Sequence, residues 1–63
     1  MSVNASLNMF TNFGSIRRDV KVKVYMGADW QRGYVIGTTA TSCSVQLPTR
    51  AVTVYDLRNI KPA

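Results

Sequence analysis

Two stretches of the sequence carry basic and aromatic side chains at alternate positions. Lys21, Lys23 and Tyr25 follow one another at every second residue, and Arg32 and Tyr34 repeat the pattern. Alternate residues of a β-strand point to the same face, so each set would line up on one surface. Cations neutralise phosphates, and an exposed tyrosine ring gives an unpaired base a stacking face worth about 1–3 kcal/mol. The pattern therefore predicts a surface that binds nucleic acid.

The net charge of the chain agrees with a polyanionic partner. Eight Lys and Arg residues against three acidic residues give a formal net charge of +5 and an isoelectric point near 10.0. A solvated basic surface is the simpler alternative, but so large a charge on 63 residues favours nucleic acid. RNA suits the pattern better than duplex DNA, because no recognition helix is predicted. The candidate nucleic-acid-binding residues are Arg17, Arg18, Lys21, Lys23, Tyr25, Arg32, Tyr34, Arg50, Tyr55 and Arg58.

Several basic and aromatic residues also have a purely structural interpretation. Lys21 and Lys23 would guard a strand edge against aggregation. Arg58 would cap a helical turn, and Lys61 would be solvated. Trp30 suits a hydrophobic cover over one end of the fold as well as it suits binding, since tryptophan is often largely but not fully buried.

The sequence does not predict an enzyme. It contains no His to act as a general base, and Asp19, Asp29 and Asp56 are far apart, at strand ends or turns where Asp commonly caps the backbone. The Ser and Thr residues have no evident activating partner. The single Cys43 is expected to be a small buried hydrophobe. We therefore expect no catalytic residues, no metal and no cofactor.

The basic and aromatic side chains need a sheet to position them, and the alternation of apolar residues predicts one. Five short strands are expected, over residues 19–25, 30–38, 42–47, 50–55 and 60–61. The first two would form a hairpin across residues 26–28, and one turn of 3₁₀ helix is expected at residues 56–59. The residues expected to face the core are Val20, Val22, Val24, Gly33, Val35, Gly37, Cys43, Val45, Leu47, Val52, Val54 and, beneath the sheet, Leu57.

Residues 1–18 differ in composition from the rest of the chain. They are rich in Asn and Ser, and we expect a flexible tail, in which Ser6 could cap a short helix that ends at Gly14. The alternative is a segment held against the sheet. Neither a secretory signal nor a membrane-spanning stretch is apparent, and one unpaired cysteine suits a reducing compartment. We expect a cytoplasmic protein, monomeric and without a membrane partner, with its folded domain at residues 19–63.

These elements describe an all-β, five-stranded SH3-like barrel, and the sequence resembles the Tudor-type members of that group. The matching residues are Val22-Lys23-Val24-Tyr25, Gly27, Trp30, Gly33, Val35, Val54 and Asp56-Leu57-Arg58, within residues 19–61. Gly27 with Gly33-Tyr34-Val35 is also similar to the glycine-spaced motif of KOW domains, which are associated with RNA and ribosomes. The whole chain, with its Asn-rich leader, resembles a family of small hyper-conserved proteins of marine picocyanobacteria.

The resemblance implies one of two binding modes. Many Tudor domains read methylated Lys or Arg through an aromatic cage, and Trp30 and Tyr34 match its first half. The second half is replaced by residues 46–50, where Arg50 would repel a cationic ligand. Bacterial Tudor- and KOW-like barrels that bind nucleic acid fit the charge better.

Three hypotheses follow for the function. The first is an RNA-binding protein that engages structured RNA, such as tRNA or rRNA, with little sequence specificity. The second is a protein-interaction module that binds a peptide through an aromatic patch at Trp30 and Tyr34. The third is a structural subunit of a larger complex, anchored by Phe10 and Phe13.

Overall fold

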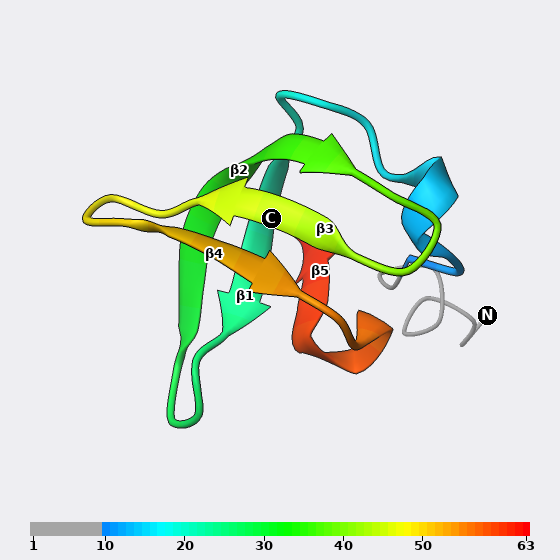
Figure 1. The fold of residues 1–63 in the computed structure, drawn as a ribbon. Coiled ribbons are helices and arrows are strands. Elements are labelled where there is room, and N and C mark those ends of the chain that lie inside the picture. The colour runs from blue at the N-terminus through cyan, green and yellow to red at the C-terminus, as the bar shows by residue number, and fades with distance from the viewer. Residues whose placement is uncertain (1–9) are drawn as a thin grey trace, which may run out of the picture.

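The computed structural model describes residues 10–63, which form one antiparallel sheet and two single turns of 3₁₀ helix (Figure 1). The strand order is β4-β3-β2-β1-β5. The strands are β1 (Lys21–Tyr25), β2 (Trp30–Thr38), β3 (Cys43–Gln46), β4 (Ala51–Val54) and β5 (Ile60–Pro62). The helical turns are η1 (Phe13–Ser15) and η2 (Leu57–Asn59). The predicted all-β class is confirmed, as are the five strands and the helical turn before the last one.

The sheet is strongly curved but open. β2 bends, with a shift of register between Val35 and Gly37, and carries β3 and β4 over β1 and β5 (Figure 1). Within residues 10–63, β4 and β5 are the two edges and do not pair with each other. Closure of the sheet into the predicted barrel is therefore not confirmed. In the described part of the chain, no helix has the length and apolar character needed to cross a membrane.

β1 begins two residues later than its alternation predicts. Asp19 adopts a left-handed conformation, with φ of 67°, which ends the extended run on its N-terminal side. Asp is one of the few side chains that tolerate this region, because its short polar group can bond locally. Pairing with β2 nevertheless continues past the strand, since the amide of Asp19 donates to the carbonyl of Val35 at 2.8 Å.

The hairpin between β1 and β2 is confirmed. The amide of Met26 donates to the carbonyl of Asp29 at 2.9 Å, and Gly27 takes φ of 95°, a value that favours glycine. The Tyr25 hydroxyl also donates to the carbonyl of Gly27 at 2.9 Å. The turn is therefore closed by both backbone and side-chain bonds.

The core is made mostly of the residues that alternation assigns to the inner face, with three additions. The prediction is wrong for Gly37, because the register shift after Val35 places it opposite Ser44, which points away from the core between the buried Cys43 and Val45. The fully or nearly buried apolar residues are Phe13, Ile16, Val22, Val24, Val35, Cys43, Val45, Leu47, Val54 and Ile60. Val20, Val52 and Leu57 face the same cluster but are only half-buried. Burial raises the pKa of the Cys43 thiol, as expected for a core residue and not for a nucleophile.

The N-terminal segment contributes more to the core than a flexible tail would. The Asn12 side chain accepts a hydrogen bond from the Ser15 amide at 2.8 Å and caps η1. This turn directs Phe13 and Ile16 inward, with exposed fractions of only 7% and 4%. The predicted tail of residues 1–18 did not place these side chains in the core, because they follow no strand alternation. The first part of the helix predicted from Ser6 to Gly14 lies outside the described residues. Its second part is wrong, because residues 10–12 are not helical and η1 begins only at Phe13.

Gly33 gives a direct test of how closely β2 approaches β3. A Cβ atom at Gly33 would lie 2.5 Å from the carbonyl oxygen of Gln46 and 2.8 Å from a methyl group of Val45. We expect Gly33→Ala to lower the free energy of unfolding by about 1–3 kcal/mol, the usual effect of overpacking. Urea denaturation followed by circular dichroism measures the change.

Gly37→Ala is the matched control on the same strand. A Cβ atom there would meet nothing within 4 Å. We expect it to change the free energy of unfolding by less than about 0.5 kcal/mol. Equal losses in the two variants would contradict the close approach at Gly33.

Candidate nucleic-acid interface

The pairing of β1 with β2 places the predicted basic and aromatic residues on one face of the sheet. In antiparallel strands, residues directly opposite each other point to the same side. Val22 and Val24 point into the core, so their neighbours along β1 point away from it, onto what we call the outer face. The outward pairs are Lys21 with Tyr34, Lys23 with Arg32, and Tyr25 with Trp30.

The outer face continues onto the strands on either side of this hairpin. β5 sets Lys61 opposite Lys23, and β3 sets Gln46 opposite Tyr34. Three rows of side chains result, each running across the strands. We name them the cation row (Lys61, Lys23 and Arg32), the ring row (Tyr25 and Trp30) and the groove row (Lys21, Tyr34 and Gln46).

The cation row concentrates positive charge without compensation. Lys23 has a cation directly opposite it on each side, Arg32 on β2 and Lys61 on β5. Like charges in directly opposed positions destabilise a sheet. Among residues 10–63 the one ion pair joins Arg58 to Asp56, so no carboxylate bridges to this row. An anionic ligand would offset the repulsion.

The ring row is joined to the cation row by Lys61. The rings of Tyr25 and Trp30 have centroids 5.4 Å apart and are tilted by 56°. The ammonium nitrogen of Lys61 lies 4.3 Å from the centre of the Trp30 ring, a cation–π contact. Trp30 remains 36% exposed. It therefore contacts Lys61 and remains partly accessible.

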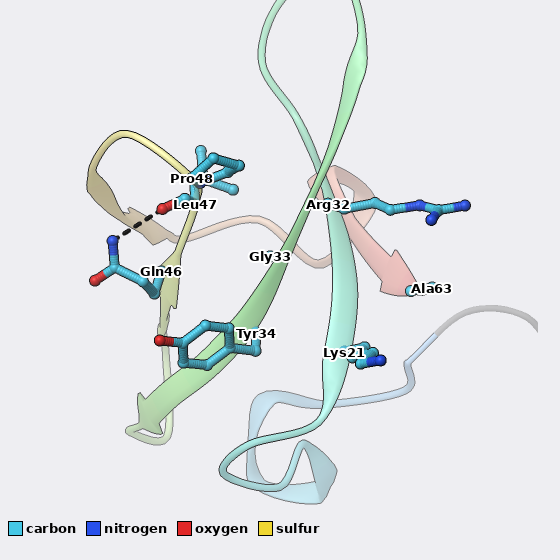
Figure 2. A pocket seen from close by; sticks show the side chains of 8 residues that line it. All are labelled: Lys21, Arg32, Gly33, Tyr34, Gln46, Leu47, Pro48 and Ala63. Carbon is cyan, nitrogen blue, oxygen red and sulfur yellow. Dashed lines mark hydrogen bonds between the residues drawn. The ribbon is translucent and has the colours of Figure 1, made fainter.

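The groove row lies beside an open groove of ≈ 760 Å³ (Figure 2). Tyr34 is 49% exposed. In Figure 2 its ring extends from β2 on the side of Gln46, whereas Arg32 extends in the opposite direction, toward Ala63. The full lining of the groove is Lys21, Arg32, Gly33, Tyr34, Gln46, Leu47, Pro48 and Ala63. The groove is thus lined by a ring and an amide on one side of β2 and by two cations on the other (Figure 2).

Trp30 and Tyr34 do not form one aromatic patch. Tyr34 lies four positions after Trp30 on the extended strand, a span of about 13 Å. Trp30 instead contacts Tyr25, and a cation already lies over its ring. The predicted patch combined two residues of the same face that lie in different rows.

The remaining candidates lie outside the three rows. The Arg18 guanidinium donates through Nε to the carbonyl of Ile36 at 3.0 Å, so it is held against β2. Arg17 is exposed beside it. Arg50 lies in the turn between β3 and β4, and Tyr55, 74% exposed, follows β4. These four residues border the sheet without joining the outward ladder of β1 and β2.

Arg58 forms an ion pair with Asp56. Its guanidinium makes two hydrogen bonds to the carboxylate of Asp56, at 2.9 and 3.2 Å, and its amide donates to the same group. The side-chain bond first, and the backbone bond next, hold the pKa of Asp56 below its usual value. Asp56, and not Arg58, therefore caps η2. Arg58 is paired with this carboxylate and is less available to a phosphate than the cations of the outer face.

Two residues of the outer face were not among the sequence candidates. Lys61 follows the buried Ile60, and this alternation signals an outward side chain. Gln46 was expected to point outward, but an uncharged amide on a strand does not by itself indicate a binding site. Their relevance comes from the partners that β1 and β2 set opposite them, which the sequence does not specify.

Comparison with known proteins finds no matching family, no matching curated protein and no matching solved structure. Among the described residues, no group of His, Cys, Asp and Glu could hold a metal ion. The function must therefore be inferred from the outer face itself.

The ion pair at η2 can be tested by its pH dependence. Because the folded pKa of Asp56 is lowered, its contribution to stability is present above the ordinary pKa of Asp, near 3.9, and is lost as the pH falls through the lowered value. We expect Arg58→Gln to raise the Asp56 pKa toward the ordinary value, as measured by carboxyl ¹³C NMR. Arg58→Lys should raise it less, since the charge remains. The same Asp56 pKa in all three proteins would contradict the contact.

Proposed function

We propose that this chain is a small, non-enzymatic RNA-binding protein that engages structured RNA, such as tRNA or rRNA, through its outer face. The observation that carries the proposal is the cation row. Lys61, Lys23 and Arg32 stand directly opposite one another on three adjacent strands, with no carboxylate bridging to them in the described residues. A sheet gains no stability from such an arrangement. Phosphates would neutralise the row and release their counterions, which supplies affinity without sequence specificity.

The rows beside the cations favour RNA over duplex DNA. Tyr25, Trp30 and Tyr34 are all at least 36% exposed on the same face as the cations. Aromatic faces bind bases that are splayed out of a helix, as in the loops of a folded RNA. The described residues contain no α-helix that could enter a major groove.

We further propose that the open sheet belongs to the Tudor-type SH3-like barrels. The strand order β4-β3-β2-β1-β5, the curvature of β2 and the 3₁₀ turn before β5 support this assignment. A cytoplasmic monomer remains part of the proposal, because one buried free cysteine is compatible with a reducing compartment.

The two other hypotheses have less support. A peptide-reading cage would need several rings around one site, but Trp30 and Tyr34 lie in separate rows and Lys61 already covers Trp30. A structural subunit anchored by Phe10 and Phe13 would need both rings at the surface. Phe13 is 7% exposed within the core of its own chain, and Phe10 is half-buried against that core. The outer face therefore fits a polyanion better than it fits a peptide ligand or a docking partner in a larger complex.

The proposal predicts a specific loss of salt dependence when the cation row is altered. Trp30, the single tryptophan of the chain, lies against Lys61, so its fluorescence should report the binding of bulk tRNA. We expect Lys23→Gln to weaken binding about fivefold near 0.1 M salt and to reduce the slope of log affinity against log salt by about 0.7–0.9.

Two variants serve as controls for Lys23→Gln. Lys23→Arg keeps the charge and should keep the slope. Arg58→Gln removes the same charge from a residue that is already paired with Asp56, and should change the slope by much less. Equal effects of the Lys23→Gln and Arg58→Gln changes would show that only net charge matters. No binding by the wild-type protein even at low salt would refute the proposed function.

A further inference from the structure

The groove row contains the three kinds of chemical group that one nucleotide requires. Lys21 provides a cation on β1, Tyr34 a ring on β2 and Gln46 a primary amide on β3. Adjacent strands are about 4.8 Å apart, so the row spans about 10 Å across the sheet. Because all three residues lie on strands or directly at their ends, their positions are set by the sheet and not by a loop.

The amide of Gln46 is held in one orientation. Its Nε2 donates to the carbonyl oxygen of Leu47 at 2.9 Å, which assigns the nitrogen and oxygen ends of the group (Figure 2). No other described residue hydrogen-bonds to this amide, so Oε1 and the second N–H remain open to a ligand. The residue is half-buried, and it lines the groove together with Leu47 and Pro48. A fixed amide of this kind can select a ligand by hydrogen bonding.

We propose that the groove row binds one unpaired adenine nucleotide of the RNA. The base stacks on Tyr34, its edge bonds to the amide of Gln46, and a phosphate contacts Lys21. This inference rests on the proposed RNA binding and adds to it a position at which the base is selected. The other rows would remain indifferent to sequence.

Adenine meets two requirements of the row. With a phosphate at Lys21 and the base on Tyr34, a purine extends farther toward Gln46 than a single-ringed pyrimidine. Adenine then offers an amino donor beside the N7 acceptor, the pattern to which a glutamine amide binds through two hydrogen bonds. Guanine presents only acceptors, O6 and N7, on the same edge. The larger ring system also covers more of the exposed Tyr34 face.

Single-stranded oligo(A) and oligo(U) of equal length provide the test, because they carry the same number of phosphates. We expect the wild-type protein to bind oligo(A) about tenfold more tightly than oligo(U) at the same salt concentration. Equal affinities would overturn the inference while leaving the proposed function intact. Absence of binding to either oligonucleotide and to tRNA would refute both.

Gln46→Leu tests the amide directly, since it keeps the size of the side chain and removes its hydrogen bonds. We expect it to lower oligo(A) affinity about tenfold and oligo(U) affinity by less than about twofold. Gln31→Leu is the matched control, because Gln31 pairs with the inward-facing Val24 and so points away from the outer face. It should leave both affinities unchanged. An equal loss for oligo(A) and oligo(U) in Gln46→Leu would contradict base selection.

A measurement on the wild-type protein protects the test against misfolding of the variant. In ¹H–¹⁵N spectra the side-chain amide of Gln46 should shift strongly with oligo(A) and weakly with oligo(U). The side-chain amide of Gln31 should not shift with either. An unshifted Gln46 amide at saturating oligo(A) would overturn the inference, whatever the variant does.

Discussion

The pairing of β1 with two neighbours is the constraint on which the rest of the structure depends. Val22 and Val24 are 0% and 2% exposed, and each burial contributes about 1.5–3 kcal/mol. Because side chains alternate along a strand, a slip of one residue would expose both valines and turn Lys21 and Lys23 toward the core. An unpaired ammonium group in an apolar core is far too costly to be tolerated. The register is therefore fixed, and the composition of the outer face is fixed with it.

The same pairing explains how a small domain tolerates a concentrated positive surface. Each directly opposed pair of like charges costs about 0.2–1 kcal/mol, and Lys23 takes part in two such pairs. Burial of Val22 and Val24, the neighbours of Lys23 on β1, stabilises the sheet by several times as much. The sheet can therefore remain stable despite this repulsion, without a carboxylate beside the cations. Because stability does not require this charge pattern, binding of an anionic ligand is its simplest explanation.

In the proposed function, one row of the outer face supplies affinity for RNA and another selects a base. The cation row would contact phosphates, whose charge is the same at every position of an RNA. The groove row presents Tyr34 and the oriented amide of Gln46, groups that distinguish one base from another. Lys61 connects the cation row to Trp30 through a cation–π contact. A phosphate that contacts Lys61 would therefore also change the environment of the Trp30 ring.

The sequence by itself determined the strands, most of their turns and the side of each strand that meets the core, except at Gly37, where the register shift in β2 reverses the alternation. Alternation and turn residues are local properties of the chain. It also determined that Lys23 and Arg32 point outward, but not what lies beside them. Only the tertiary structure decided that Lys61 and Gln46 complete the rows, that Trp30 and Tyr34 are separated, and that Phe13 belongs to the core. These facts depend on which strands pair and in what register. Hydrophobic packing among distant segments sets that pairing, and no short stretch of sequence encodes it.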